Sequence, residues 1–250
     1  MEKILTNVMN IGEQMLISGA EVHRVEDSVR RMCCALGAKR IDIFIITSSM
    51  VATVYTQEGE IFTQTRRITA RGTDLEKIHR LNDLSRKICE GKVPPTEIEG
   101  KLQQALDCKS YPFWLECISY AGIAGAFTLF FGGGWIEMLV SLLVGAIVRY
   151  VILFAEKAIP NKIFSKFISA VTATSLAFLA VKIGWIGTVD KIIIGNIMTL
   201  IPGVGLTNAL RDLFTGDSIA GLLRSIEAVL TALAIAAGYF LVVILGGFAL

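Results

Sequence analysis

Long apolar segments fill the second half of the chain, and they constrain its fold more than any other feature. A helix needs about 20 apolar residues to cross the hydrocarbon core of a bilayer. Residues 1–110 hold 31 of the 46 charged residues, which leaves 15 for the other 140. The apolar segments predict about five transmembrane helices, at residues 113–131, 135–155, 163–183, 192–206 and 219–245. The sequence therefore predicts a membrane protein, with a soluble domain at 1–110 and a transmembrane helical domain at 111–250.

The first 110 residues show the pattern of a small α+β domain. Apolar residues recur at helical spacing over 2–17 and 20–36, and further helices are expected at 73–90 and 96–107. Runs rich in β-branched residues between them predict strands at 41–48, 51–56 and 61–68. We expect these strands to form a small, mostly antiparallel sheet.

The loop charges predict how the chain crosses the membrane. The first ten residues lack the long apolar core and Ala-x-Ala site of a signal peptide, so we expect the N-terminal domain to stay in the cytoplasm. Lys157, Lys162 and Lys166 follow the second predicted span, and Arg211 follows the fourth. The positive-inside rule places both loops in the cytoplasm. This orientation gives a cytoplasmic N-terminus and an external C-terminus.

Several function classes find no support in the sequence. The net charge is only +2, which does not suggest a nucleic-acid surface. The five cysteines are an odd number without metal-ligand spacing, so we expect free thiols and no metal site or cofactor. Familiar hydrolase, metalloprotease and nucleotide-binding motifs are missing. Thr215-Gly216-Asp217 is similar to part of an intramembrane aspartyl protease motif, but residue 214 is Phe and Asp217 falls in a predicted loop. We therefore expect no enzymatic activity.

The fourth predicted span is interrupted and is the most informative segment. Pro202-Gly203-Val204-Gly205 breaks its helical pattern, and Asn208, Arg211 and Asp212 follow. Broken backbone within a membrane is tolerated where protein or a water-filled cavity surrounds it, and transporters bind substrates at such breaks. An ordinary loop that ends a helix explains the same residues equally well.

Ionisable residues within the spans are a second candidate feature. Glu227 lies about eight residues into the fifth span, and Arg224 precedes it by almost one turn. Such residues usually pair or line a cavity, and Arg211 and Asp212 are close enough along the chain to join them. Arg211 and Asp212 could equally pair with each other and hold the loop. Glu116 and Glu137 lie nearer span ends and could extend to the interface.

A polar run near the start of the chain, from Ser18 to Glu26, is a third candidate. His23 and Glu26, three residues apart, could meet on one helix face. The alternative is a solvated or interface face, and two histidines in the chain give little basis for a metal site.

Three segments together resemble a known family. They are SGAEVHRVEDSVRRM at 18–32, LIPGVGLTNALRDLFTGD at 200–217 and RSIEAVLTALAIAAG at 224–238. The chain resembles the threonine/serine exporter (ThrE-like) family over nearly its whole length, and within it the separate large subunit of the YjjP-like type. The resemblance implies a bacterial inner-membrane secondary transporter that exports threonine and serine, or succinate-like dicarboxylates, driven by the proton-motive force. Fused members are about twice as long, so a small membrane subunit is implied as a partner in a hetero-oligomer.

The resemblance also assigns positions of interest. In the soluble domain, where we expect an interface or gate, these are Ser18, Gly19, Arg24 and Glu26. In the membrane part they are Pro202, Gly203, Asn208, Arg211, Asp212, Gly216, Asp217, Arg224 and Glu227, and we expect substrate binding or the transport path at all of these except Gly216 and Asp217. The alternative functions are a membrane-anchored regulatory or scaffold protein acting through its soluble domain, and an intramembrane enzyme. The scaffold hypothesis predicts that the spans tolerate polar-to-apolar changes, and the enzyme hypothesis lacks a nucleophile or metal constellation.

Overall fold

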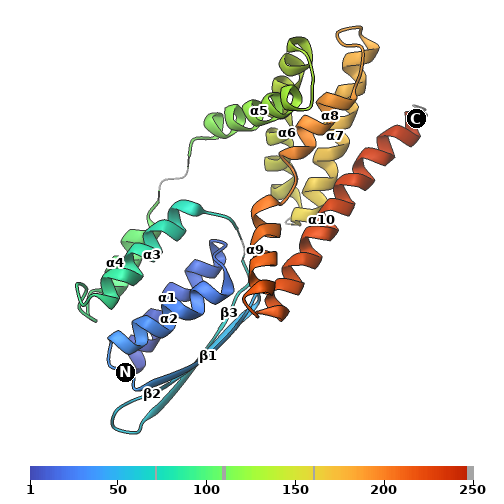
Figure 1. Ribbon diagram of the computed structural model, residues 1–250. Coiled ribbons are helices and arrows are strands. Elements are labelled where there is room, and N and C mark those ends of the chain that lie inside the picture. Colours follow the sequence, from blue (N-terminus) through green and yellow to red (C-terminus); the bar gives the residue numbers. More distant parts are fainter. Residues whose placement is uncertain (71, 109–110, 160, 247–250) are drawn as a thin grey trace. The chain divides into compact units, whose positions relative to one another are not determined.

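The chain forms two compact units in a computed structural model that describes residues 1–70, 72–108, 111–159 and 161–246 (Figure 1). One unit combines Met1–Lys109 with Val204–Ser225, and the other combines Ser110–Gly203 with Ile226–Leu250. We call them the N-terminal unit and the helical unit. The segment Val204–Ser225, which the sequence analysis counted with the membrane helices, shares a unit with the N-terminal residues. The expected domain boundary at residue 110 and the C-terminal residue 250 lie outside the described residues.

A three-stranded antiparallel sheet lies in the N-terminal unit. Its strands are β1 (Arg40–Ile46), β2 (Ser49–Tyr55) and β3 (Ile61–Arg67), paired in the order β1-β2-β3. Burial alternates along β2, where Met50 and Val54 are fully buried, because successive side chains of a strand point to opposite faces. The predicted strands are confirmed to within two residues at each end.

Helices of the N-terminal unit build its core against the sheet. The four that precede residue 110 are α1 (Glu2–Ile17), α2 (Val22–Ala35), α3 (Leu75–Cys89) and α4 (Ile98–Leu106). Helix α1 contacts β2 and β3, whereas α2 contacts β1. At Gly12 of α1 an added Cβ would lie 2.8 Å from Cγ2 of Val29, so this glycine permits the close approach of α1 and α2. Asp74 caps α3 by accepting a hydrogen bond from the Lys77 amide at 3.0 Å, at the predicted start of this helix.

Six helices make up the rest of the chain. They are α5 (Phe113–Phe130), α6 (Trp135–Ala158), α7 (Lys162–Lys182), α8 (Asp190–Met198), α9 (Gly203–Phe214) and α10 (Ser218–Leu245). In the helical unit α5 packs on α6 and α8, and α7 packs on α6 and α8. Small residues bring these helices close: a Cβ added to Gly195 of α8 would lie 2.2 Å from Oγ1 of Thr128 on α5.

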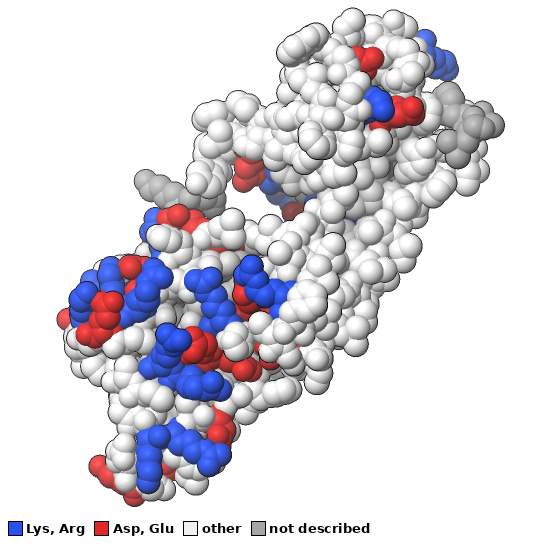
Figure 2. Space-filling model, viewed as in Figure 1, with Lys and Arg blue, Asp and Glu red and all other residues white. Residues whose placement is uncertain are grey.

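Four of these helices are long and apolar enough to cross a membrane, namely α5, α6, α7 and α10. The pair α8 and α9, bent by 57°, passes the same test together, so the described residues offer four or five crossings. The fourth predicted span differs in detail, since α8 ends at Met198 and α9 begins at Gly203. Pro202, which has no amide hydrogen, directly precedes α9, a position where proline does not disrupt a helix. On the face shown in Figure 2, charged side chains gather over the N-terminal elements, while the long helices are mostly free of them.

Candidate functional site

The turn between α1 and α2 depends on Gly19. The amides of Gly19 and Ala20 donate to the carbonyls of Leu16 and Met15 at 3.0 Å each, which closes α1 with a Schellman motif. Gly19 adopts φ +95°, and an added Cβ would lie 2.7 Å from the Gly72 carbonyl oxygen. Only glycine fits here for both reasons, and the turn leaves the Gly19 and Ala20 carbonyls directed out of the helix.

Polar side chains of α9 and α10 bind the backbone of this turn. Asn208 Nδ2 donates to the Gly19 carbonyl at 3.1 Å, and Arg224 Nη2 donates to the Ala20 carbonyl at 2.8 Å. The Val22 amide, at the start of α2, donates to Oδ1 of Asp212 at 3.3 Å. We call this cluster the junction: the backbone of Gly19–Val22 with the side chains of Asn208, Asp212 and Arg224. All of its members belong to the N-terminal unit.

A buried ion pair lies at the centre of the junction. Nη1 of Arg224 lies 3.2 Å from Oδ2 of Asp212, and the Asp212 side chain is fully buried. A buried carboxylate is stable only when an opposite charge and hydrogen bonds compensate for its lost hydration, and Arg224 and the Val22 amide supply both. Arg211 pairs instead with Glu21 at the edge of the junction, where the Arg211 side chain is 55% exposed. The expected alternative, a pair between Arg211 and Asp212, is therefore not the arrangement that forms.

Two further predicted residues of this unit lie in α2. Glu26 accepts a hydrogen bond from the Ile45 amide at 3.0 Å and so connects α2 to β1. Burial raises the pKa of the Glu26 carboxyl above its ordinary value and the charge of Asp217 raises it further, while the Ile45 hydrogen bond acts in the opposite direction. Arg24 is exposed and lines a cavity of about 250 Å³ between α2 and α3.

The remaining predicted residues occupy separate places. Ser18 is buried, and its carbonyl accepts from the Asp74 amide at 2.9 Å. Oδ2 of Asp217, just beyond α9, lies 3.9 Å from Nδ1 of His23. Gly203 is the first residue of α9. Glu227 lies on α10 in the helical unit and is not part of the junction.

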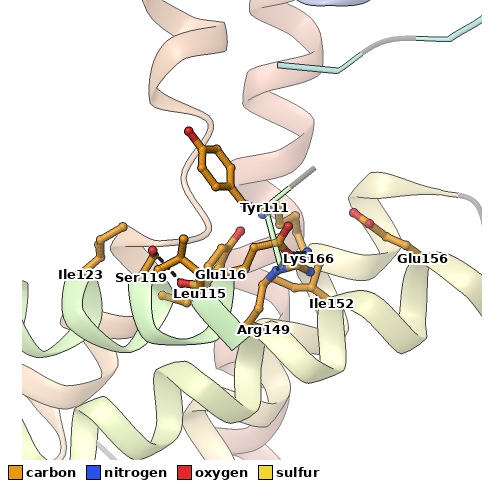
Figure 3. A pocket seen from close by; sticks show the side chains of 10 residues that line it. Tyr111, Leu115, Glu116, Ser119, Ile123, Arg149, Ile152, Glu156 and Lys166 are labelled. Carbon is orange, nitrogen blue, oxygen red and sulfur yellow. Dashed lines mark hydrogen bonds and ion pairs between the residues drawn. The ribbon is translucent and has the colours of Figure 1, made fainter. Parts of the chain in front are cut away.

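A second cluster, which the sequence analysis did not select, lies in the helical unit. A cavity of about 440 Å³ is lined by residues of α5, α6 and α7, and we call it the polar pocket (Figure 3). Its lining residues are Tyr111, Leu115, Glu116, Ser119, Tyr120, Ile123, Arg149, Ile152, Glu156 and Lys166. Arg149 pairs with Glu116 through its Nε, 3.0 Å from Oε2, and through Nη2. The guanidinium also lies 5.6 Å from the ring centroid of Tyr120.

The sequence did contain a signal for the polar pocket. Arg149 lies well inside the 24-residue apolar helix α6, and an ionisable residue within a span is by default a functional candidate. The sequence analysis used Lys166 only to orient the loops and treated Glu116 as a residue near a span end. Spacing could not show that side chains from three helices converge. Among the described residues no group of His, Cys, Asp and Glu could hold a metal ion, and all five cysteines are free thiols.

The fold and these clusters define a class, that of multi-pass membrane proteins with charged residues inside their spans. Residues 6–246 match the ThrE family model, described as "Putative threonine/serine exporter". The match covers nearly the whole chain, so the chain belongs to the threonine/serine exporter family and is a membrane transport protein.

Known relatives differ in how much of their length this chain covers. It is 24% identical over 234 residues to the "Probable succinate transporter subunit YjjP" of Klebsiella aerogenes, covering 93% of this chain and 90% of that protein. It is 25% identical over 246 residues to the "Threonine/serine exporter" of Corynebacterium glutamicum, covering 94% of this chain and 50% of that protein. The YjjP protein of Escherichia coli is 23% identical, with 93% of this chain and 91% of that protein covered. No solved structure matches the chain.

Proposed function

We propose that the chain is one subunit of a bacterial inner-membrane secondary transporter that exports small carboxylate-bearing metabolites, driven by the proton-motive force. The observation that carries the proposal is the convergence of Glu116, Arg149 and Lys166 on a cavity among apolar helices. Ionisable residues are costly in such helices and mark substrate or ion paths. The names of the relatives, which mention threonine, serine and succinate, describe molecules that all carry a carboxylate.

A small membrane subunit is the proposed partner. The chain spans nine tenths of the YjjP relatives but only half of the Corynebacterium exporter. The Corynebacterium exporter is about twice as long as this chain. This supports the idea that a separate subunit supplies the half that this chain does not match. The N-terminal unit is proposed to lie in the cytoplasm, where an exporter takes up its substrate.

The junction is proposed as the gate of this transporter. The expected gate residue Gly19 and the expected path residues Asn208, Asp212 and Arg224 contact each other within one unit. Arg224 and Asp212 neutralise each other, so neither is available to a substrate while the junction is closed. Opening would release the α1–α2 turn from α9 and the first turns of α10. Ser18, Arg24 and Glu26 would then position the turn, and Pro202, Gly203, Arg211 and Glu227 would line or adjoin the path.

Efflux measurements test the proposal. Cells preloaded with labelled threonine or succinate would express this chain alone, this chain with the small-subunit gene, or neither. We expect efflux only from cells with both subunits, and we expect an uncoupler to abolish it. Full export by the single chain would contradict the two-subunit proposal, and export unaffected by the uncoupler would contradict the energy source.

Variants test the path residues in the same cells. Arg211→Gln, Arg211→Lys and Glu227→Gln would be compared at matched membrane expression, with assembly of the two subunits checked by co-purification. A path residue should lose efflux while assembly persists. Normal assembly and export by all three variants would refute this part of the proposal.

A further inference from the structure

Lys166 is the one cation of the polar pocket that no carboxylate accompanies at close range in the described part of the chain. We infer that the polar pocket is a binding site for a small molecule with a single carboxylate group, and that Lys166 is the residue that pairs with that group. The inference rests on the proposed function, because it names where the exported molecule binds.

The pocket has the size and position of a ligand site. Its volume of about 440 Å³ lies within the range of small-molecule sites. Its residues come from the first turns of α5, the second half of α6 and the first turns of α7. Because α6 runs back from the end of α5 and α7 returns again, all three parts lie at one end of the helices. The pocket is thus placed at the end of the helices at which α5 starts.

The guanidinium of Arg149 is already occupied. Two of its nitrogens bond to Oε2 of Glu116, and the rings of Phe113 and Tyr120 lie 5.5 and 5.6 Å from it. Two bonds to one carboxylate oxygen, together with the two nearby rings, restrict the movement of the guanidinium. Arg149 therefore provides a positioned wall of the pocket, and an incoming anion would have to displace Glu116 to reach it.

Lys166, in contrast, is half-buried and forms no hydrogen bond or ion pair with any residue that the structure describes. Figure 3 shows its side chain together with those of Glu116 and Arg149, whereas the exposed Glu156 lies apart from them. A half-buried ammonium without a close counter-ion is unfavourable, and a bound carboxylate would remove this cost.

Charge counting sets the number of carboxylates. Glu116 and Arg149 cancel, which leaves the positive charge of Lys166 beside them, while the exposed Glu156 acts on Lys166 from beyond ion-pair distance. One carboxylate neutralises the charge of Lys166. A dicarboxylate would bring a second negative charge, for which no further cation is free among the described lining residues. The remaining acid of the lining, the exposed Glu156, suits an ammonium group, so a zwitterion such as threonine matches the pocket better than succinate.

Direct binding measurements on the purified full chain test the inference. The chain would be reconstituted in nanodiscs of phosphatidylcholine, and binding of labelled threonine and labelled succinate measured at equilibrium. We compare Lys166→Gln, Lys166→Arg and the control Lys157→Gln, which removes an exposed charge on α6 outside the pocket. We expect the wild type to prefer threonine and Lys166→Gln to weaken its binding about tenfold or more. Lys166→Arg should retain most of the affinity, and Lys157→Gln all of it.

Other outcomes would overturn the inference. Thermal unfolding would first show that the wild type and Lys166→Gln are both folded. Equal affinity of the two proteins would then show that Lys166 is not part of the site. A preference for succinate would contradict the single-carboxylate argument. In nanodiscs with phosphatidylglycerol, native mass spectrometry would show whether Lys166 retains a lipid instead. Lipid retention without binding of either carboxylate would make the pocket a headgroup site and refute the proposal.

Binding and export also separate this inference from the proposed function. Lys166-dependent binding without efflux from the two-subunit complex would uphold the site and refute the transport proposal. If Lys166→Gln changed neither efflux from the two-subunit complex nor binding, the site would be refuted and the transport proposal upheld.

Discussion

Single residues at the junction hold the α1–α2 turn in place, and Asp212 makes two of their contacts. Its carboxylate is fully buried and accepts the Val22 amide at one oxygen while the other lies 3.2 Å from Arg224. Arg224 in turn donates to the Ala20 carbonyl, so the same two side chains bind the turn at both ends. Removal of either charge would leave the other largely buried without a counter-ion.

Asp212→Asn tests this arrangement. The amide oxygen still accepts from Val22, but Arg224 loses its counter-ion, so we expect a loss of stability of about 3 kcal/mol. Thermal unfolding would report the loss, and hydrogen exchange would show faster exchange at residues 19–25. The double variant with Arg224→Met should cost less than the sum of the single changes. Arg211→Gln breaks the exposed pair with Glu21 and should cost no more than about 1 kcal/mol of stability. A loss as large as that of Asp212→Asn would contradict the central role given to the Asp212–Arg224 pair.

Gly19→Ala tests the turn itself, and Gly59→Ala is a matched control. Both glycines have φ near +90°, but a Cβ at Gly59 would meet nothing within 4 Å. Gly59→Ala should therefore cost only the backbone penalty of about 1–2 kcal/mol. Gly19→Ala adds a clash with the Gly72 carbonyl oxygen, and we expect roughly 1–3 kcal/mol more. Equal unfolding midpoints for the two variants would show that the clash relaxes without cost.

At the scale of elements, Glu26 joins helix to sheet through a carboxylate whose charged form is disfavoured by folding. Burial raises the pKa of Glu26 in the folded chain, so the folded state binds more protons than the unfolded state between the two pKa values. The contribution of Glu26 to the free energy of unfolding therefore falls as pH rises from the ordinary pKa of 4.5 through the raised folded pKa. Above the folded pKa this contribution is constant.

Glu26→Gln removes this dependence, because the amide keeps an acceptor oxygen for Ile45 and does not ionise. We expect the variant to gain stability relative to the wild type as pH rises through that window. Unfolding midpoints measured from about pH 4 to pH 8 would show the difference. Asp27→Asn removes an exposed carboxylate from the same helix and serves as the control. A constant difference between wild type and Glu26→Gln at all pH values would refute the argument.

Elements were predictable from the sequence where the signal is local, and their contacts were not. Runs rich in β-branched residues predicted the strands, apolar residues at helical spacing predicted the helices, and Pro202 marked the break between α8 and α9. The partners of Asp212 lie 190 residues away at Val22 and on another helix at Arg224, and spacing along the chain carries no information about such pairs. Likewise, Glu116, Arg149 and Lys166 come from three helices, so only the packing of these helices reveals the polar pocket.

At the scale of the whole molecule, the chain leaves its N-terminal unit after Lys109, returns to it at Val204 and leaves it again after Ser225. Val204–Ser225 shares that unit with Met1–Lys109, although three long helices and α8 separate them in the sequence. The junction requires Asp212 to lie on the same side of the membrane as Val22, since their atoms are 3.3 Å apart. We predict that α5, α6 and α7 each cross the membrane, which would take the chain to the opposite side. On that prediction, the segment that brings the chain back is the bent pair α8–α9.

This parity argument predicts five crossings rather than four. Helix α8 has nine residues and extends about 13 Å at 1.5 Å per residue, which is too short for a core of about 30 Å, so it crosses only together with α9. Reporter fusions at Asp107, Gly187, Gly216 and Leu250 would determine the side of each loop. We expect Asp107 and Gly216 in the cytoplasm and Gly187 and Leu250 outside. The lysines around the connection of α6 to α7 predict the same orientation by the positive-inside rule. If α8–α9 entered and left by the same face, Gly216 would lie with Gly187 and the C-terminus with Asp107. That result would be incompatible with the junction, because Asp212 could not then reach the Val22 amide across the membrane.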